Sequence, residues 1–376
     1  MIYLDNAATT RFKPERVIKA LIEETRHGAN PGRSGHKAAA ESALKVYRAR
    51  ENIKDFFNAP NHEVIMTKNC TEALNLAIFG AVRQGGHVIT TAYEHNSVLR
   101  PLYKLYSEKK IKLTVISPDK GGNISPRCIA SKFTRDTVMV ITTHVSNVTG
   151  KMLDIGETGR LCAKAGILYV VDASQSAGHV DIDVPKANVD ILCAPGHKGL
   201  HGVQGTGFLL THERILLNPL LFGGTGTASD NVYQPKDLPE SLESGTLNTP
   251  GIAALDEAVS FCRKNRTFIT KTVRNRTEEL LYGLKNLKNV IIYTPPTEYN
   301  GVVSFNVDGL TSTETADRLN VRDVAVRAGL HCAPLAHNYL KTLDIGAVRA
   351  SVAADTSAKD VRIFLSALEK IIKSLD

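Results

Sequence analysis

One lysine in the chain stands where it could act as a nucleophile toward a carbonyl group. Residues 189–210 read VDILCAPGHKGLHGVQGTGFLL, which places Lys198 in a glycine-rich loop between two apolar runs. Core residues around its stem would withhold water from the ammonium form, lower its pKa and leave a neutral amine. Taken alone, the pattern fits a solvated loop lysine better, so the interpretation depends on a second stretch.

That second stretch, residues 166–178, reads GILYVVDASQSAG, with Asp172 at the end of an apolar run and Gln175 three residues later. The carboxyl end of a buried strand is where open α/β sheets bind ligands. Pyridoxal-phosphate enzymes need a Schiff-base lysine and a carboxylate that keeps the pyridine nitrogen protonated. Asp172 alone could equally be the N-cap of a following helix. Together with Lys198, it indicates pyridoxal 5'-phosphate as the cofactor.

Two segments offer groups for the phosphate of this cofactor. In TKNCTEALNL, a strand end is followed by Cys70 and Thr71 and then by a helical pattern. The free amides of a helix N-terminus, with a hydroxyl beside them, can bind an anion. The alternative for Thr71 is an ordinary N-cap. His197, next to Lys198, is a second candidate for the phosphate.

Further polar residues follow predicted strands. His95, in AYEHNS, could lie against the pyridine ring and move protons, although as a single residue it also fits a polar loop position. Asn147, in HVSNVTG, and Gln175 are candidates for hydrogen bonds near the phenolic oxygen of the ring.

The segment VAVRAGLHCAP combines Arg327, His331 and Cys332. A guanidinium suits bidentate capture of a carboxylate, and Arg349 in GAVRAS offers another, as an amino-acid substrate would require. Polar and basic neighbours would favour the thiolate form of Cys332. The alternative, a small buried hydrophobic residue, is what we expect for Cys162 and Cys193, which lie in apolar surroundings.

Composition excludes several classes of protein. The chain has 376 residues, of which 43% are hydrophobic and 22% charged, as in soluble globular proteins. No apolar run approaches the ~20 residues of a membrane span, and the N-terminus has no signal-peptide pattern, so a cytoplasmic location is expected. The net charge of +8 is spread along the chain without a basic–aromatic cluster, so nucleic-acid binding is not expected. The cysteine spacing predicts no metal site.

The hydrophobic pattern predicts an α/β fold. Short strands at 63–67, 87–90, 112–117, 137–143 and 167–172 alternate with helical patterns, which indicates a mainly parallel sheet. Beyond about residue 264 the pattern changes to a helix over 263–287, strands near 289–293 and 302–306, and helices near 313–319 and 358–374. We therefore predict a large cofactor-binding domain at 14–264 and a smaller α+β domain made of 1–13 and 265–376.

Eight segments, in this order and at these distances, resemble the cysteine desulfurases among the fold-type I pyridoxal-phosphate enzymes (the aminotransferase class V family). They are YLDNAATT, CTEALN, YEHNS, HVSNVTG, VDASQSAGH, GHKGLHG, ESGTLNTPGI and RAGLHCAP. The similarity spans nearly the whole chain. The short RAGLHCAP form is more similar to the group II branch, the SufS-like enzymes and bacterial selenocysteine lyases, than to group I.

The resemblance implies a role for each candidate. Toward the cofactor, Lys198 would form the Schiff base, Asp172 would pair with the ring nitrogen and His95 would stack on the ring. Gln175 and Asn147 would contact the ring oxygen. The phosphate would be bound by Cys70, Thr71, His197 and, from the other subunit of a homodimer, Thr246. For the substrate the implied roles are carboxylate binding by Arg349 with Arg327 nearby and sulfur acceptance by Cys332. Asn147 and His36, the latter in GANPGRSGH, are further substrate-binding candidates. L-cysteine would yield L-alanine and a persulfide that passes to an acceptor protein.

Two departures from the group II pattern keep alternatives open. Pro195 stands where a serine usually supplies a phosphate hydroxyl, and Leu330 replaces a histidine beside the cysteine. The second departure leaves L-selenocysteine as an alternative substrate, with a selenocysteine lyase as the alternative enzyme. A non-catalytic phosphate-ligand binding protein is the alternative of another class. Thr246 could instead be an N-cap for the helix that starts near Pro250.

Overall fold

A computed structural model describes residues 1–31, 35–227 and 229–375. Its centre is a seven-stranded sheet in the order β2-β8-β7-β6-β5-β3-β4. The strands are β2 (His62–Thr67), β3 (His87–Thr91), β4 (Lys112–Ile116), β5 (Thr137–Thr143), β6 (Leu168–Asp172), β7 (Ile191–Pro195) and β8 (Gly207–His212). The pairs from β4 to β7 are parallel and only β8 runs antiparallel to its neighbours, which confirms the predicted α/β fold with a mainly parallel sheet.

Successive strand residues point to opposite faces of the sheet, and helices cover both faces, so the sheet is buried on both sides. On one face, Val170 and Cys193 pack with helices α3 (Cys70–Ala81) and α4 (Asn96–Ser107). On the other, Val171 packs with α2 (Lys37–Phe56) and with Cys162 of α6 (Ile155–Ala165). Cys162 and Cys193 are fully buried, as expected for small core residues.

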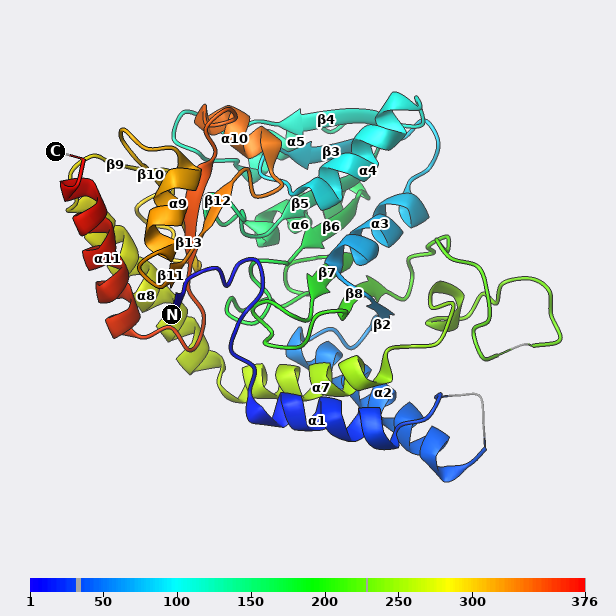
Figure 1. The fold of residues 1–376 in the computed structure, drawn as a ribbon. Coiled ribbons are helices and arrows are strands. Elements are labelled where there is room, and N and C mark those ends of the chain that lie inside the picture. The colour runs from blue at the N-terminus through cyan, green and yellow to red at the C-terminus, as the bar shows by residue number, and fades with distance from the viewer. Residues whose placement is uncertain (32–34, 228, 376) are drawn as a thin grey trace.

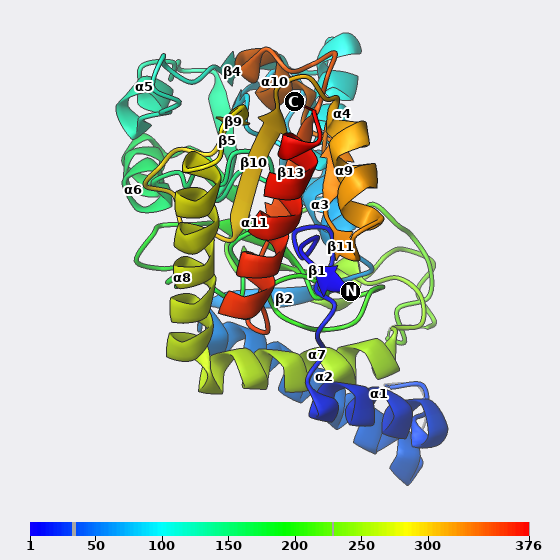
Figure 2. The same cartoon turned by 60° about the vertical axis from the view of Figure 1, so that its left-hand side comes forward.

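The C-terminal part forms a second, antiparallel sheet in the order β12-β13-β10-β9. Its strands are β9 (Val290–Ile292), β10 (Val302–Val307), β12 (Arg327–Gly329) and β13 (Ala347–Ser351), with helices α8 (Arg266–Lys285), α9 (Ser312–Asn320), α10 (Pro334–Leu340) and α11 (Ala358–Lys373) around them. The N-terminal strand β1 (Ile2–Tyr3) pairs with β11 (Val324–Ala325), so the N-terminus lies beside this C-terminal part (Figures 1 and 2). The division into 14–264 and 1–13 with 265–376 remains a prediction.

The predicted single helix over 263–287 is wrong at its start. Helix α7 (Thr249–Lys264) ends before Asn265, and α8 begins at Arg266. The side chain of Asn265 donates to the carbonyl of Phe261 (2.9 Å), as does its backbone N–H (3.0 Å), and these bonds close the last turn of α7. The spacing of apolar residues in the sequence does not reveal the break at Asn265, because the helices on both sides of it have an apolar face.

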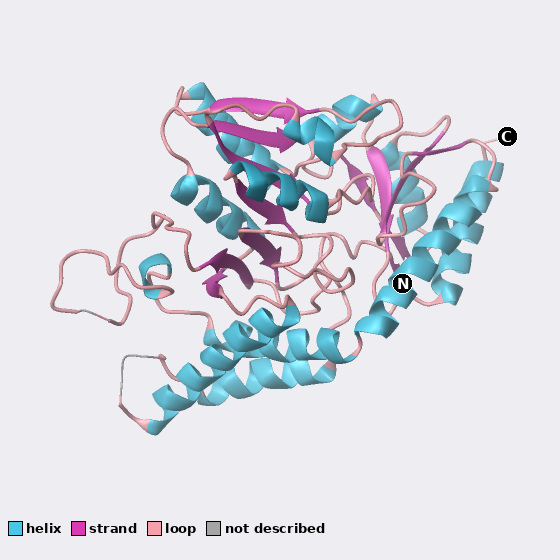
Figure 3. Ribbon diagram, turned by 180° about the vertical axis from the view of Figure 1, so that it is seen from behind, coloured by secondary structure: helices cyan, strands magenta, loops and turns pink. Residues whose placement is uncertain are grey.

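Helix α7 packs against α1 (Glu15–His27) and α2 below the central sheet (Figure 1). The segment between β8 and α7, described for residues 213–227 and 229–248, is a long loop that partly projects from the body of the chain (Figure 3), while its residues Leu217, Leu238 and Leu242 pack against the core. This long loop exposes Phe222, Val232 and Tyr233 and holds the short 3-10 helix η1 (Glu240–Leu242). The remaining helix, α5 (Pro126–Ala130), precedes β5. No helix in the described ranges is long and apolar enough to cross a membrane.

Candidate active site

A pocket at the carboxyl ends of β5, β6 and β7 gathers most of the predicted cofactor residues. It is lined by Asn69, Cys70, Thr71, His95, Ser97, Thr143, Asn147, Asp172, Ser174, Gln175, Pro195, His197 and Lys198. Parallel strands direct their carboxyl ends to one edge of the sheet, so loops that are distant in sequence meet there. We call this set of residues the central pocket.

Lys198 enters the central pocket from the turn that follows β7. Burial lowers the pKa of its ammonium group, and nearby Arg349 lowers it further, while Asp172 acts in the opposite direction. Its backbone carbonyl accepts a hydrogen bond from the hydroxyl of Thr10 (3.0 Å), which fixes the turn to the N-terminal arm. Lys198 is half-buried, and its lowered pKa favours the neutral, nucleophilic amine over the ammonium form of a solvated loop lysine.

Asp172, the last residue of β6, is only 2% exposed. Its Oδ1 accepts from the backbone N–H of Ser174 (2.8 Å) and lies 3.6 Å from the sulfur of Cys70. Turns, not a helix, follow it, so the N-cap alternative does not apply. Within the described chain Asp172 forms no ion pair at all, and a buried carboxylate in that state suits a cationic ring nitrogen.

Thr71 is not the cap of its helix. Asn69 caps α3, accepting from the N–H of Glu72 (2.9 Å), and this leaves the Thr71 hydroxyl available to the pocket. That hydroxyl lies 2.9 Å from the hydroxyl of Ser97, which is 2.8 Å from Nδ1 of His95. At the start of α3, the N–H groups of Cys70 and Thr71, two residues that line the pocket, have no acceptor among the described residues.

His95 is the N-cap of α4, and its Nδ1 accepts from the N–H of Ser97 (3.0 Å). Burial, followed by the charge of Lys198, lowers its pKa to about 4, so the imidazole is neutral at pH 7. The sequence-based prediction missed Ser97, although it belongs to the same segment, because a serine one residue inside a helix resembles any surface position.

Gln175 and Asn147 are both buried in the pocket wall. The Gln175 side chain donates to the carbonyl of Ala7 in the N-terminal arm (3.0 Å). The Asn147 side chain donates to the carbonyl of His331 (2.7 Å). Their amide groups thereby join the pocket to the N-terminal arm and to the cysteine segment.

Arg349, in β13, is buried and reaches the pocket wall. It donates to the Asn147 carbonyl (3.1 Å) and to Oδ1 of Asp5 (3.1 Å), while its Nε is buried without a partner among the described residues. Burial lowers the pKa of the guanidinium and Asp5 opposes the shift. Asp5 was missed by the sequence-based prediction, since only folding brings the arm to β13. Arg327 is exposed and lies opposite Arg349 in the β12–β13 register.

Cys332 is exposed, so it is not a core cysteine. Its carbonyl accepts from the backbone N–H of Asn96 (2.7 Å), the residue that follows His95. Leu330, the departure beside the cysteine, is 38% exposed, and Pro195, the other departure, ends β7 in the pocket wall.

Like Arg349, Arg327 and Cys332, the candidates His36 and Thr246 are not among the residues that line the central pocket. His36 caps α2, with Nδ1 accepting from the N–H of Ala39 (3.3 Å), next to residues 32–34, which are not described. Thr246 is exposed in the long loop, and its hydroxyl has no hydrogen-bond partner among the described residues. The N-cap of α7 is Asn248, which accepts from Gly251 (3.1 Å), so the N-cap alternative for Thr246 is wrong.

The residues present fit pyridoxal phosphate. Lys198 offers an amine with a lowered pKa, and Asp172 a buried carboxylate without an ion-pair partner among the described residues. The first two residues of α3, Cys70 and Thr71, offer N–H groups without an acceptor among the described residues. His197 has a buried Nδ1 to which no described residue donates or accepts, and burial lowers its pKa to about 4. No cluster of metal-ligating side chains occurs in the described ranges.

Comparisons with known proteins agree with this chemistry. A family model described as aminotransferase class-V matches residues 2–364. Two proteins named probable cysteine desulfurase are similar over nearly their full length. The one from Methanothermobacter thermautotrophicus is 34% identical over 98% of this chain and 94% of its own, and the one from Pyrococcus abyssi is 36% identical over 100% and 95%.

A solved apo structure of cysteine desulfurase from Thermococcus onnurineus NA1 has a TM-score of 0.92 and 33% identity, covering 99% of this chain and 95% of that one. The fold class predicted from sequence, that of the pyridoxal-phosphate enzymes of fold type I, is thereby confirmed. The chain belongs to the aminotransferase class-V family and, within it, to the cysteine desulfurases.

Proposed function

We propose that the chain is a pyridoxal-phosphate-dependent cysteine desulfurase that converts L-cysteine to L-alanine and leaves a persulfide on Cys332. One observation carries this proposal. The turn with the exposed Cys332 is hydrogen-bonded to Asn96 and Asn147, which flank or line the pocket that holds Lys198 and Asp172. These contacts support a site in which Cys332 supplies the thiol nucleophile and Lys198 the carbonyl-reactive amine.

Lys198, Asp172, His95, Gln175, Asn147, Cys70, Thr71 and His197 would hold the cofactor. When bound, pyridoxal phosphate supplies an electron sink for negative charge that develops at the substrate Cα. Arg349, with Arg327 nearby, binds the substrate carboxylate, since a guanidinium matches its two oxygens. Lys198 takes the Cα proton, because its lowered pKa favours the neutral amine that a base requires.

Cys332 then acts on the sulfur. Its thiolate attacks the substrate Sγ, a sulfur–sulfur bond forms, and the Cβ–S bond breaks. The electron pair of that bond stays with Cβ, which takes up one proton to become the methyl group of alanine, while Cα regains the proton that it lost. The transferred sulfur remains on Cys332 as a persulfide until an acceptor protein or a thiol reductant removes it.

The test follows alanine and sulfide from L-cysteine in the presence of dithiothreitol and, in separate samples without reductant, follows the mass of Cys332. The wild type should form alanine and gain one sulfur on Cys332, and Lys198→Ala should do neither. If Cys332→Ala released sulfide at the wild-type rate, the role of Cys332 would be wrong. Wild-type protein that showed no absorbance change with pyridoxal phosphate would instead support a non-catalytic phosphate-ligand binding protein.

A selenocysteine lyase is the second candidate function, and the observation that supports it is the side chain of Leu330. This apolar residue, 38% exposed, stands beside Cys332 where the resembling group II enzymes carry a histidine for proton transfer. A selenol is more acidic than a thiol and releases selenium more readily, so its cleavage depends less on a protein thiol. Strong selenocysteine activity that survives Cys332→Ala, with feeble cysteine activity, would select the lyase.

Membership of the group II branch, a cytoplasmic location and a homodimer are parts of the same proposal. The turn between β12 and α10 spans only residues 330–333, as in a short cysteine segment. The exposed Phe222, Val232 and Tyr233 of the long loop form an apolar surface that a second subunit would cover. In that homodimer, the exposed Thr246 would bind the phosphate in the partner's site.

A further inference from the structure

Cys332 stands in an unusual turn. The N–H of Ala333 donates to the carbonyl of Leu330 (2.9 Å), which closes a four-residue turn around His331 and Cys332. Both central residues have positive φ, 49° for His331 and 57° for Cys332. A turn of this kind normally uses glycine or asparagine at these positions, because a side chain in the left-handed region costs about 1 kcal/mol or more. Something in the surroundings must therefore hold the turn.

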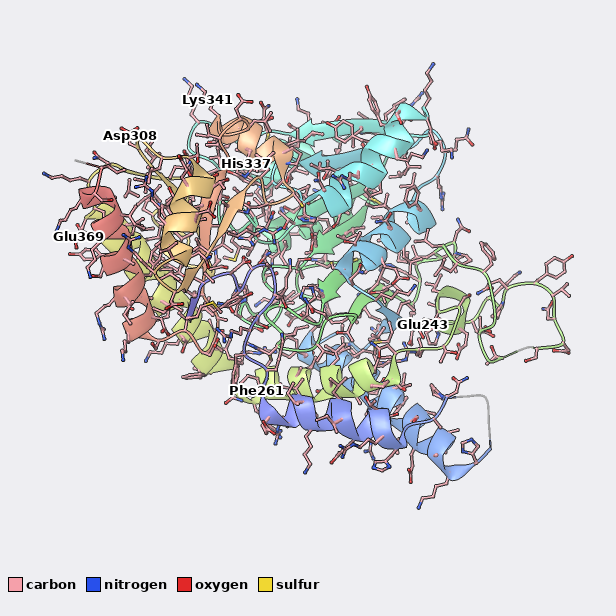
Figure 4. All side chains as sticks on the ribbon, viewed as in Figure 1. Glu243, Phe261, Asp308, His337, Lys341 and Glu369 are labelled. Carbon is pink, nitrogen blue, oxygen red and sulfur yellow. The ribbon has the colours of Figure 1, made fainter. Side chains whose placement is uncertain are left out.

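The two sides of the turn are built differently. Cys332 and Leu330 are exposed, whereas His331 is 5% exposed and its ring lies beside that of His337 on α10, at a centroid distance of 5.7 Å. Figure 4 shows His337 on the helix that directly follows the turn. Nε2 of His331 lies 3.0 Å from the carbonyl of Ala347 in β13, so that nitrogen carries the proton and donates. The imidazole is thus an inward anchor and the thiol points outward.

The anchor connects to the substrate-binding arginine by two routes. Ala347, which accepts from the ring, stands two residues before Arg349 on the same strand. The His331 carbonyl accepts from the side chain of Asn147 (2.7 Å), and the Asn147 carbonyl accepts from Arg349 (3.1 Å). A closed set of contacts therefore runs from Arg349 through Asn147 to His331 and back along β13.

We propose that His331 is a positioning residue for sulfur transfer: its buried ring holds the left-handed turn against β13 and thereby fixes the Cys332 thiol relative to the carboxylate anchor Arg349. The role rests on the proposed function, since it concerns the attack of Cys332 on the substrate sulfur. His331 touches neither the substrate nor the cofactor in this role. Small displacements matter for such a step, because misplacing a reacting group by ~1 Å can cost ~100-fold in rate.

The experiment separates the two halves of the reaction in the holoenzyme. Exchange of the L-cysteine Cα proton in deuterated buffer, followed by NMR, reports on Lys198 and the cofactor. Single-turnover persulfide formation on Cys332, followed by mass spectrometry, reports on the thiol. His331→Ala should keep proton exchange within about threefold of wild type and slow persulfide formation roughly 100-fold. Equal loss in both assays would overturn the proposal in favour of a general structural role.

Two further variants distinguish the ring anchor from backbone strain. His331→Gly removes the strain of positive φ but also the donor to Ala347, so it should stay as slow as His331→Ala. His331→Gln keeps a donor at similar reach and should restore much of the rate. If the glycine variant formed persulfide at the wild-type rate, the ring would not be the anchor.

The matched control is His87→Ala. Like His331, His87 is buried, and its ring nitrogens bond to Thr114 and Thr137. It is the first residue of β3 and so lies at the end of the central sheet opposite the pocket. It should lower stability without slowing persulfide formation selectively, and a selective loss there would count against the proposal. Failure of the proposed function gives another pattern, because wild-type protein would then form no persulfide and Cys332→Ala would change nothing.

Discussion

The backbone N–H of Asn96 donates to the carbonyl oxygen of Cys332 across 2.7 Å. Asn96 is the first residue of α4, directly after His95, so the helix whose cap lies in the central pocket also holds the backbone of the cysteine turn. Because both atoms are main-chain atoms, the link is insensitive to side-chain type. The thiol and the pocket therefore keep their relation even where Leu330 departs from the family pattern.

Substitution of Arg349 tests the carboxylate anchor. Lysine cannot make the two parallel hydrogen bonds of a guanidinium, and hydrogen bonds to charged groups contribute about 1.5–3 kcal/mol, so Arg349→Lys should raise KM for L-cysteine by roughly 10- to 100-fold. Arg327→Lys is the control, since Arg327 is exposed and should shift KM far less. Steady-state kinetics decide the point, and a larger effect at position 327 would reverse the two assignments.

Asp172→Asn tests the carboxylate at the end of β6. The amide oxygen can still accept from the N–H of Ser174, so the local turn should survive. A neutral amide cannot stabilise a cationic ring nitrogen, and losses of such electrostatic stabilisation typically cost about 100- to 1,000-fold in kcat. The variant should therefore bind pyridoxal phosphate and turn over poorly. Normal kcat with bound cofactor would remove Asp172 from its proposed role.

Glu94 offers a prediction about pH and stability. It is fully buried, its Oε1 accepts from the hydroxyl of Thr91 (2.5 Å) and the N–H of Thr143 (3.0 Å), and its Oε2 has no partner among the described residues. Burial raises its pKa to about 8. Between pH 4.5 and 8 the folded chain therefore binds a proton that the unfolded chain releases, and stability falls as pH rises, by at most about 1.4 kcal/mol per pH unit.

Glu94→Gln mimics the protonated acid and should remove this dependence. Thermal unfolding at pH 5 should give similar melting temperatures for variant and wild type, whereas at pH 8 the variant should melt higher. Equal melting temperatures at both values of pH would mean that Glu94 stays neutral throughout or is hydrated.

Mixing an inactive variant, Lys198→Ala, with one that Thr246→Ala should impair tests the shared site. Glu243, labelled in Figure 4, forms a bidentate ion pair with Arg50 (2.7 and 2.6 Å) and so anchors the base of the segment that carries Thr246. If Thr246 serves the partner subunit, a heterodimer of Thr246→Ala and Lys198→Ala chains has one intact site and one site with both lesions. Activity should then rise above that of either parent.

The matching control mixes Lys198→Ala with Asp172→Asn chains. These two residues line the same pocket of one chain, so no intact site can form and no recovery is expected. A monomeric mass in solution with full activity would exclude the shared site outright.

The sequence by itself determined the central sheet and placed the two candidate residues Lys198 and Asp172 at its edge. The short apolar runs ending at Asp172 and Pro195 alternate with helical patterns and are typical of buried parallel strands, whose carboxyl ends bring the polar residues after them to one edge of the sheet. Thr71, His95 and Asn147 follow other strands and were placed by the same rule. An apolar run and the polar residue after it are neighbours in the chain, so both can be recognised from the sequence alone.

Only the tertiary structure decided the relations between segments. Asp5 forms an ion pair with Arg349, and the His331 ring donates to the Ala347 carbonyl. The Ser97 hydroxyl links Thr71 to His95. The spacing of these residues in the sequence does not predict such contacts. Asn248, not Thr246, caps α7, and His36 caps α2 outside the central pocket. Such pairings depend on how strands and loops pack in three dimensions, because the free energy of a polar contact is set by burial and geometry.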